Sequence, residues 1–277
     1  MPAVIADVNL RTYSRPEVVS HYATLDYLTP CEEWLIETHV KPGMHVLDLG
    51  VGGGRTTSRL AKVAGRYVGV DYAGEMVRIC RQRFPRLNFV KASASHMAMF
   101  GDASFDCIFF AFNGIDFIYP REQLQRSLSE CRRLLRPGGL FIFSSHNPRA
   151  VLQRPSWNPV RVRQFSKDLA GRMRLPVKFI LPVAIGIRMA LACATALGGS
   201  IKRGLGRIPS AAFWTGEGYL FDPAHGGLLT HYWTPPRAAA ELAKHGFRHL
   251  GTKGDDYPRP SRRYITDWYY YVFAKCE

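Results

Sequence analysis

The sequence lacks the cysteine patterns of disulfide-bonded and zinc-binding proteins. Its 277 residues include six cysteines, and no two of them are spaced as C-x-x-C. Several lie in apolar runs, such as Cys107 in FDCIFF, and we expect the cysteines to be reduced core residues. The first residues also lack a basic stretch followed by an apolar one, which predicts no secretory signal. Together these absences favour a cytoplasmic protein.

Internal repeats and low-complexity tracts are also missing, and acidic residues are scarce in one segment. Hydrophobic residues make up 47% of the chain and charged residues 21%, which excludes wholesale disorder. The net charge of +15 is unevenly placed, because residues 149–207 hold twelve basic side chains and one acid, Asp168. The basic character therefore belongs to that segment rather than to the whole protein.

From residue 44 to 145, short apolar runs alternate with helical patterns. Apolar strands that are each followed by a helix are typical of a parallel sheet covered on both faces. The pattern stops after residue 145 and resumes with a helix at 234–246, so residues 149–231 are expected to form an insertion. Strands are predicted over 44–50, 66–71, 88–92, 105–112, 140–145, 247–253 and 268–275, and helices over 55–64, 74–84 and 119–139, the last stopped by Pro137 and Gly138.

Four glycines fall within five residues, 50–54, directly after the first predicted strand. Each glycine costs roughly 0.5–1 kcal/mol of backbone entropy in ordered structure, so something must approach the backbone more closely than a Cβ allows. The dinucleotide-binding motif G-x-G-x-x-G fails, because its last position is Arg55 or Thr57, and no P-loop lysine follows. What remains is D-x-G-x-G-x-G, starting at Asp48, with Asp71 at the end of the second strand.

Together with SFD at 104–106 and LRPGG at 135–139, this pattern resembles the class I S-adenosylmethionine-dependent methyltransferases, in particular their type-11 and type-25 subgroups. The resemblance covers about residues 11–148 and 232–277. It implies an α/β fold with a Rossmann-like, seven-stranded, mainly parallel sheet, helices on both faces and an antiparallel last strand. Residues 1–148 would be the cofactor-binding core with an N-terminal cover helix, 149–231 a mainly helical insertion, and 232–277 the rest of the core.

The resemblance also implies how S-adenosylmethionine is held. Asp48 would hold the methionyl amino group through water, and Asp71 would accept both ribose hydroxyls. Ser93 stands where the family commonly has an aspartate at the adenine edge, and Tyr13 would help to close the methionyl end. The residues expected to bind the cofactor are Tyr22, Asp48, Gly50, Val51, Gly52, Asp71, Tyr72, Met76, Ser93, Ala94, Phe110 and Asn113, and no metal site is expected.

The methyl group of a sulfonium is already activated, so positioning and the exclusion of water carry much of the acceleration. A base helps when the acceptor is a hydroxyl. The candidates are His146 after the fifth strand and His231 or Tyr232 after the insertion, while transfer without a base stays open. Further polar side chains lie at Asn113, Asp116 and His225.

The insertion contains 21 nearly uncharged residues, 179–199, but Arg188 in their middle argues against a membrane span. On a helix over 174–203, the basic side chains fall on one third of the circumference, which predicts an amphipathic helix. It is interpreted either as a cap over the pocket or as a contact with an anionic membrane. The basic residues concerned are Arg174, Lys178, Arg188, Lys202 and Arg203.

The leading hypothesis is a methyltransferase for a small molecule, acting on a hydroxyl of a sugar, glycolipid or natural product. A membrane-associated lipid or quinone methyltransferase is the alternative, located on the inner face of the membrane. A third hypothesis is a basic nucleic-acid-binding protein. It is disfavoured because the basic segment has few interleaved aromatics, and because the loop after the fourth strand lacks the Asn/Asp-Pro-Pro-aromatic motif of base-modifying enzymes.

Overall fold

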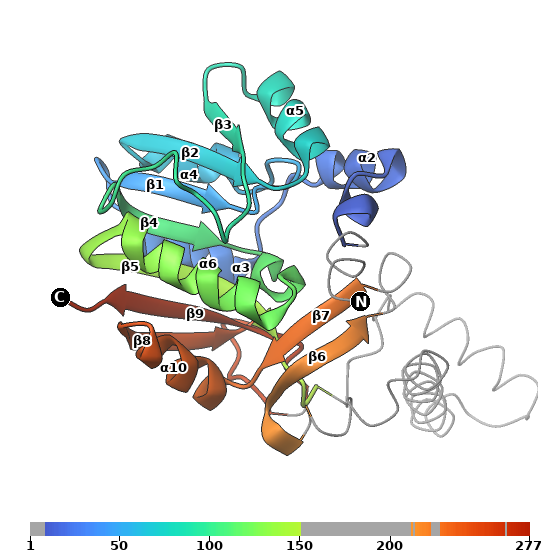
Figure 1. The fold of residues 1–277 in the computed structure, drawn as a ribbon, viewed down its shortest axis with the longest axis vertical. Helices are drawn as coiled ribbons and strands as arrows, with labels where there is room; N and C mark the ends of the chain where they lie inside the picture. Colours follow the sequence, from blue (N-terminus) through green and yellow to red (C-terminus); the bar gives the residue numbers. More distant parts are fainter. Residues whose placement is uncertain (1–8, 151–211, 213, 223–227, 264) are drawn as a thin grey trace, which may run out of the picture.

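A seven-stranded sheet forms the centre of the computed structural model, which describes residues 9–150, 212, 214–222, 228–263 and 265–277 (Figure 1). Its strand order is β3-β2-β1-β4-β5-β9-β8. β9 runs antiparallel to both of its neighbours, whereas the pairs from β3 to β5 are parallel. The expected Rossmann-like sheet is therefore confirmed. The strands are β1 (His45–Leu49), β2 (Arg66–Asp71), β3 (Asn88–Lys91), β4 (Phe105–Phe110), β5 (Leu135–His146), β8 (Phe247–Gly254) and β9 (Trp268–Lys275).

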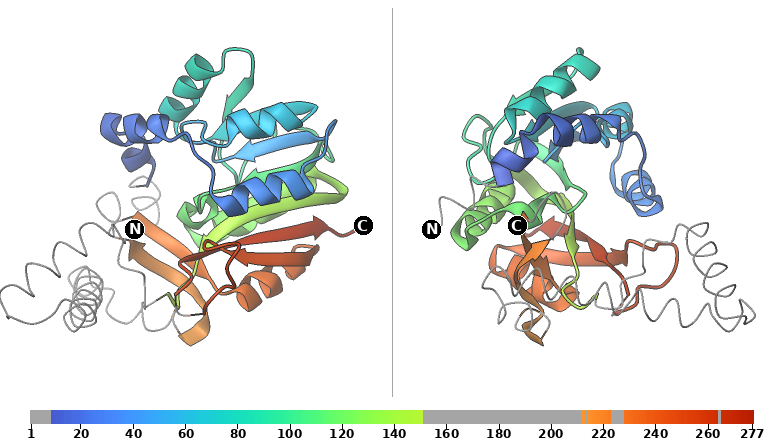
Figure 2. Two further views of the ribbon diagram at one scale, coloured as in Figure 1. Left: turned by 180° about the vertical axis from the view of Figure 1, so that it is seen from behind. Right: turned by 90° about the vertical axis from the view of Figure 1, so that its right-hand side faces the viewer.

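Helices cover both faces of this sheet (Figure 2). On one face, α3 (Pro30–His39), α4 (Thr57–Val63) and α5 (Gly74–Arg83) pack their apolar side chains on the strands. On the other face, α6 (Arg121–Leu134) and α10 (Pro235–Lys244) bury their apolar stripes against β4, β5 and β9. A further helix, α2 (Pro16–Thr24), packs on the start of α5, which directly follows β2. The carboxyl ends of β1 and β2 are thus covered by the N-terminal segment.

The expected boundary between the helix at 119–139 and the strand at 140–145 was wrong. α6 ends at Leu134, and Leu135 already pairs with Phe105 of β4. Pro137 and Gly138 therefore lie inside β5, where the register to β4 shifts by a bulge and Gly138 has a φ of +73°. The proline and glycine shape this irregular strand start instead of ending the helix, because sheet pairing replaces the last helical turn.

Sequence analysis missed α3 although the chain carries a clear signal for it. The Thr29 hydroxyl accepts the N–H of Glu32 at 3.2 Å, and the Glu32 carboxylate accepts the N–H of Thr29 at 2.8 Å. This capping box, with Pro30 in the first helical turn, is a standard sequence mark of a helix start. Pro30 and Cys31 are thus the first two residues of α3.

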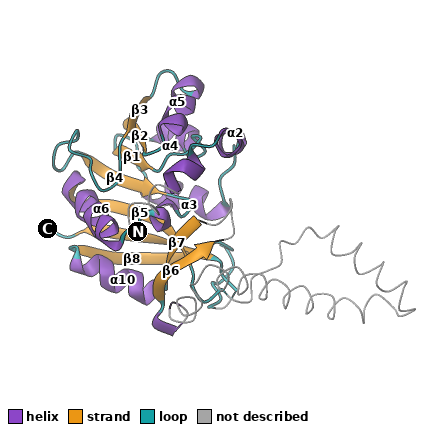
Figure 3. Cartoon of the chain, turned by 45° about the vertical axis from the view of Figure 1, so that its right-hand side comes forward, coloured by secondary structure: helices purple, strands orange, loops and turns teal. Residues whose placement is uncertain are grey.

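The described end of the insertion forms strands where a mainly helical segment was expected. β6 (Glu217–Asp222) and β7 (Leu228–Trp233) form an antiparallel hairpin, a separate two-stranded sheet (Figure 3). Five of the six residues of β7 are buried, and Tyr232 is the exception, so the burial of this strand does not alternate. The rest of the insertion, including 174–203 and His225, lies outside the described residues.

The cysteines and the lengths of the helices bear on two further expectations. Four cysteines, at 31, 80, 107 and 131, are buried and free, as expected for core residues, but Cys276 is exposed at the end of the chain. Among the described helices, none combines the length and the apolar character that crossing a membrane requires.

Candidate active site

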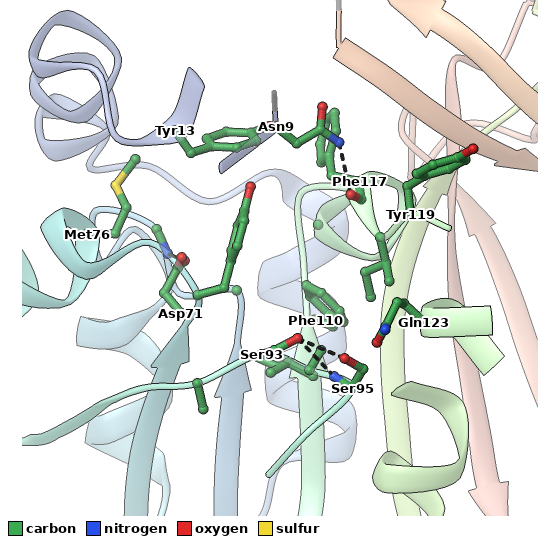
Figure 4. A pocket seen from close by; sticks show the side chains of 18 of the residues that line it. Asn9, Tyr13, Asp71, Met76, Ser93, Ser95, Phe110, Phe117, Tyr119 and Gln123 are labelled. Atoms are coloured by element: carbon green, nitrogen blue, oxygen red, sulfur yellow. Dashed lines mark hydrogen bonds between the residues drawn. The ribbon is translucent and has the colours of Figure 1, made fainter. Parts of the chain in front are cut away.

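A cavity of about 800 Å³ opens at the carboxyl ends of β1 to β4 (Figure 4). Strand ends of this kind are where ligands bind in open α/β sheets. The walls come from the turns after these strands, from the N-terminal segment and from the start of α6. The lining residues are Asn9, Tyr13, Tyr22, Leu49, Gly50, Gly52, Asp71, Tyr72, Met76, Ala92, Ser93, Ala94, Ser95, His96, Phe110, Ala111, Phe112, Gly114, Phe117, Ile118, Tyr119, Pro120, Gln123 and Arg126.

The glycine turn between β1 and α4 serves two purposes. Gly50 and Gly52 line the cavity with φ values of +65° and +54°, and a Cβ at Gly50 would lie 2.5 Å from the Phe110 ring. Gly53 has a different role, because a Cβ there would collide with the backbone carbonyl of Tyr22 in α2. The turn therefore offers bare backbone to the cavity on one side and to the cover helix on the other.

Asp71 holds the end of β2 and faces the cavity. Its Oδ2 accepts the N–H of Gly52 at 2.8 Å, and its Oδ1 accepts the N–H of Ala73 at 2.9 Å. These bonds join the glycine turn to the start of α5 and fix the carboxylate in one orientation. Burial raises the pKa of Asp71 to about 6, because desolvation disfavours the charged form.

Asp48 lies beneath the turn and is not among the residues that line the cavity. Its Oδ2 accepts hydrogen bonds from the hydroxyls of Thr56 and Tyr67, each at 2.7 Å, and burial raises its pKa to about 6. In the described structure this carboxylate therefore braces the turn from below. Val51 is likewise buried in the core under the turn. Their expected contacts with a cofactor stay predictions.

Aromatic side chains roof the cavity. The Tyr13 ring meets the rings of Tyr22, Tyr72 and Phe117 edge to face, with centroids 5.8, 6.3 and 5.4 Å apart. The Tyr72 hydroxyl is buried and has no hydrogen-bond partner among the described residues. The roof joins the N-terminal segment to the ends of β2 and β4, so it closes the cavity above the strand ends.

The adenine-edge residues expected from the sequence also face this cavity. Ser93 and Ala94 follow β3, and the Ser93 and Ser95 hydroxyls are 2.9 Å apart (Figure 4). Met76 is buried in the first turn of α5. Of the twelve residues expected to bind a cofactor, nine line this one cavity, and the exceptions are Asp48, Val51 and Asn113.

Asn113 and His146 belong to a buried polar network behind the cavity. The His146 Nδ1 lies 2.8 Å from Asp116 Oδ2, which also accepts the backbone N–H of His146 at 2.7 Å. The Ser145 hydroxyl donates to the other Asp116 oxygen at 2.6 Å, and the Asn113 amide nitrogen lies 3.2 Å from His146 Nε2. This arrangement places a proton on Nδ1 and leaves Nε2 as the hydrogen-bond acceptor. It is the geometry of a histidine oriented by a carboxylate.

The three base candidates do not converge. Tyr232 lies against His146, with ring centroids 5.2 Å apart, whereas His231 points to the opposite side of β7, between Tyr219 and Trp233. His231 is fully buried there, 3.6 Å from Glu217. None of the three candidates lines the cavity, and His146 is separated from it by Phe117, whose ring centroid is 6.5 Å away. His146 and Tyr232 are thus neighbours of the cavity, and His231 is a core residue.

Sequence analysis missed two residues that shape the cavity. Asn9 is 2% exposed, and its amide nitrogen donates to the carbonyls of Phe117 and Leu229 at 3.0 and 3.2 Å. Arg55, next to the glycine turn, forms a bidentate ion pair with Glu32 of α3 and stacks on the Phe112 ring. The ion pair with Glu32 ties the turn after β1 to α3, and the stacking on Phe112 ties it to the turn after β4. No local sequence pattern marks Asn9 or Arg55 for these roles.

Comparisons with known proteins agree with this geometry. A family model described as "Methyltransferase domain" matches residues 46–139. The chain is similar to the Mycolicibacterium smegmatis "Probable S-adenosylmethionine-dependent methyltransferase", at 35% identity over 39% of this chain and 40% of that protein. It is also similar to the fatty-acid O-methyltransferase of the same organism, at 33% identity over 42% of this chain and 41% of that protein. The chain thus matches about two fifths of the length of these relatives.

Solved structures show the same fold. The Burkholderia thailandensis 1,6-didemethyltoxoflavin-N1-methyltransferase, with bound 1,6-didemethyltoxoflavin and S-adenosylhomocysteine, aligns over 99% of this chain and 88% of its own. The TM-score is 0.58 at 16% identity. The matched segment, 46–139, contains the glycine turn, Asp71 and the strands around the cavity. Residues 46–139 are therefore a methyltransferase domain, in a chain that has the fold of the class I S-adenosylmethionine-dependent methyltransferases.

Proposed function

We propose that this chain transfers a methyl group from S-adenosylmethionine to a small-molecule acceptor in the cavity. One observation carries the proposal: Gly52 after β1, Asp71 at the end of β2 and Ser93 after β3 line the same cavity in the order of the strands. Adjacent strands are about 4.8 Å apart, so a ligand that crosses three strand ends is extended, as an amino acid joined to a nucleoside is.

The residues present fit this cofactor. Bare backbone at Gly50 and Gly52 accommodates the amino-acid part, and the fixed carboxylate of Asp71 accepts the two ribose hydroxyls. The adenine ring of the cofactor then lies beside Tyr72, and its edge faces Ser93. When bound, S-adenosylmethionine supplies an activated methyl group. The chain contributes orientation and a roof that excludes water.

For the acceptor we propose a hydroxyl group. His146 supports this choice, because its orientation by Asp116 leaves Nε2 unprotonated. This nitrogen can take the proton that the hydroxyl loses once the hydroxyl replaces the Asn113 amide as its hydrogen-bond partner. Phe117 lines the cavity and lies between it and His146. The acceptor hydroxyl would therefore have to bind at the end of the cavity that Phe117 lines. Asp116 is a positioning residue in this scheme. Sugars, glycolipids and natural products all carry suitable hydroxyls.

A second candidate function is methylation of a membrane lipid or quinone. The similarity to a fatty-acid O-methyltransferase favours a lipid acceptor, and the basic, apolar segment 174–203 would provide a contact with an anionic membrane surface. Under this alternative the protein is peripheral on the inner face of the membrane. Nucleic acid is not proposed as an acceptor, because the loop after β4 lacks the motif of base-modifying enzymes.

Labelling tests these proposals directly. The protein is incubated with methyl-labelled S-adenosylmethionine and, separately, with the soluble and the membrane fractions of a cell extract, and the labelled product is identified. A labelled small molecule from the soluble fraction supports the leading proposal, and a labelled lipid or quinone supports the alternative. Both proposals are contradicted if the label appears in RNA or DNA. They are also contradicted if the protein binds the cofactor but transfers no methyl group to any component of either fraction.

Replacing Asp71 with alanine is expected to weaken the binding of S-adenosylhomocysteine. The substitution leaves the ribose hydroxyls without their charged acceptor, which costs about 1.5–3 kcal/mol, or roughly 10- to 150-fold in Kd. Calorimetry measures the change. Unchanged affinity in the variant, or binding of NAD in preference to S-adenosylhomocysteine by the unmodified protein, would refute the assignment of this site.

The affinity for S-adenosylhomocysteine is expected to fall at acidic pH. Burial raises the pKa of Asp71 to about 6, so below this pH the free protein carries a proton there that must leave before the carboxylate accepts both hydroxyls. Affinity should therefore be constant above pH 6 and fall up to about tenfold per pH unit below it. Calorimetry between pH 5 and 8 measures this. The Asp71→Asn variant should lack the slope, and a slope that persists in it would point to Asp48 instead.

A further inference from the structure

Two polar side chains of α6 line the cavity and keep their hydrogen-bonding groups unused. Neither the amide of Gln123 nor the guanidinium of Arg126 makes a hydrogen bond or an ion pair among the described residues. The two residues are three positions apart on the helix and therefore share a face. Gln123 is half-buried and Arg126 is exposed, and Figure 4 shows the Gln123 amide pointing toward Ser95, into the cavity. Both groups are thus accessible to a ligand.

Neither carboxylate one helical turn away from Arg126 pairs with it. Glu130, four residues after it, binds the Arg133 guanidinium and accepts the backbone N–H of Met97 at 2.8 Å. Glu122, four residues before it, is exposed and forms no ion pair among the described residues. The charge of the Arg126 guanidinium therefore stays available for a ligand of the opposite charge, and its planar group of N–H donors suits anionic oxygens.

The proposed cofactor does not need these two side chains. It crosses the ends of β3, β2 and β1, whereas α6 follows β4. Figure 4 shows Gln123 on the opposite side of the cavity from Asp71 and Met76, with Phe110 between them. Adenine and ribose carry no charge, and the carboxylate of S-adenosylmethionine belongs to the amino-acid part, which we place at the glycine turn. The Arg126 charge is therefore left for another ligand of the same cavity.

The wall that leads to Gln123 is the wall expected to contact the methyl acceptor. Figure 4 shows Phe117, beside which the acceptor hydroxyl would bind, and Tyr119 on the same side of the cavity as Gln123. Ile118 lines the cavity between these two residues in the sequence. An acceptor that reaches from Phe117 to α6 therefore passes over apolar and aromatic side chains and ends at an amide and a guanidinium. A molecule with an apolar body and an anionic end matches this wall.

We infer that the methyl acceptor carries an anionic oxygen group, a carboxylate or a phosphate, and that Arg126 and Gln123 bind this group at the α6 wall of the cavity. The guanidinium supplies the charge and several N–H donors, and the amide of Gln123 supplies a further donor. The inference rests on the proposed function, because the position of the cofactor defines which wall is left for the acceptor. The contact lies away from the hydroxyl that is methylated, so it orients the acceptor and selects it by charge.

The test uses aromatic probes that share a hydroxyl and differ in charge. The protein is saturated with S-adenosylhomocysteine and titrated with 6-hydroxy-2-naphthoate or with its uncharged methyl ester. The unmodified protein should bind the acid about tenfold more tightly, as expected for a charged hydrogen bond near the surface, and salt should reduce this preference. The Arg126→Gln variant should bind the two probes within about twofold of each other, with its affinity for S-adenosylhomocysteine retained. The monophosphate of 2,6-naphthalenediol, bound more or less tightly than the acid, assigns the group as phosphate or as carboxylate.

The matched control is Arg132→Gln. Arg132 is another exposed arginine of α6, but it lines a separate pocket with Lys244 and Lys275, so the variant removes the same charge from the same helix away from the cavity. It should keep the preference for the acid. Arg126→Lys should keep part of the preference, because the charge remains while the planar donor group is lost. These substitutions are at exposed positions, so the variants are expected to fold.

The outcomes separate this inference from the proposed function. No binding of S-adenosylhomocysteine by the unmodified protein defeats the proposed function. Binding of S-adenosylhomocysteine without any preference for the acid over the ester, or a preference that persists in Arg126→Gln, defeats the anionic acceptor alone. The same follows if the acid displaces S-adenosylhomocysteine instead of binding beside it. Loss of the preference in Arg132→Gln as well would assign it to the net charge of the helix rather than to Arg126.

Discussion

The Glu32→Ala variant is expected to lose about 3–5 kcal/mol of stability, the cost of leaving a buried charge without its partner. Glu32 is fully buried, and its carboxylate binds both Arg55 guanidinium nitrogens, at 2.5 and 2.7 Å. Without it, the guanidinium stays 7% exposed between Tyr27 and Phe112 with its charge uncompensated. The midpoint of thermal unfolding should fall by roughly 10 °C, measured by calorimetry or circular dichroism.

Glu33 provides the matched control for this prediction. It is one residue away in α3 and pairs with Arg59, but the two side chains are 46% and 30% exposed. Exposed pairs contribute little, so Glu33→Ala should change stability by less than about 1 kcal/mol. The double variant Glu32→Leu/Arg55→Met should recover part of the loss, because it removes both charges together. Equal effects of Glu32→Ala and Glu33→Ala would show that the buried pair is not the cause.

The His146→Gln variant is expected to lower kcat by about 10²- to 10⁴-fold once the acceptor is identified, with the affinity for S-adenosylhomocysteine unchanged. Glutamine keeps hydrogen-bonding capacity toward Asp116 but cannot take a proton at neutral pH. The measurement is methyl transfer to the identified acceptor at saturating cofactor. An effect on kcat without an effect on cofactor binding separates proton transfer from damage to the cavity.

Two further variants check the assignment of this base. Asp116→Asn should lower kcat and change its pH profile, because the carboxylate sets which ring nitrogen of His146 carries the proton. Tyr232→Phe keeps the ring against His146 and should leave the rate largely intact if His146 is the base. A full-rate His146→Gln variant together with a slow Tyr232→Phe variant would move the role to Tyr232.

Local patterns predicted the central part of the fold well. The apolar runs at β1, β2, β4 and β9 are long enough to mark strands, and the helical stripe of α6 was identified by its spacing. The start of β5 at Leu135 was not, because Pro137 and Gly138 are usual helix stops and the pairing of Leu135 with Phe105 depends on a distant strand. The hairpin β6–β7 was missed for a different reason: both strands are short, β7 is buried along almost its whole length without alternation, and the hairpin follows a segment interpreted as helical.

The site was predictable where it follows strand ends. The glycine turn and Asp71 could be placed from sequence because the carboxyl ends of parallel strands meet at one edge of the sheet. The contacts of Asn9 and the pairing of Glu32 with Arg55 were out of reach, since they join residues that no local spacing connects. The capping box of Glu32 with Thr29 was encoded locally and was overlooked. His231 is the opposite case. As a histidine it was a candidate base, but its position in β7 buries it between the rings of Tyr219 and Trp233.

The long-range ties of Asn9 also set an order of assembly during synthesis of the chain. Strands β1 to β4 span residues 45–110, so they can pair as soon as that stretch has left the ribosome. The Asn9 amide meets its second carbonyl at Leu229, 220 residues downstream. Loops of this length close late, since their entropy cost precedes any gain from the contact. A nascent chain therefore forms the strand ends beneath the cavity first. The N-terminal segment that roofs the cavity takes its final position only when the hairpin β6–β7 has left the ribosome.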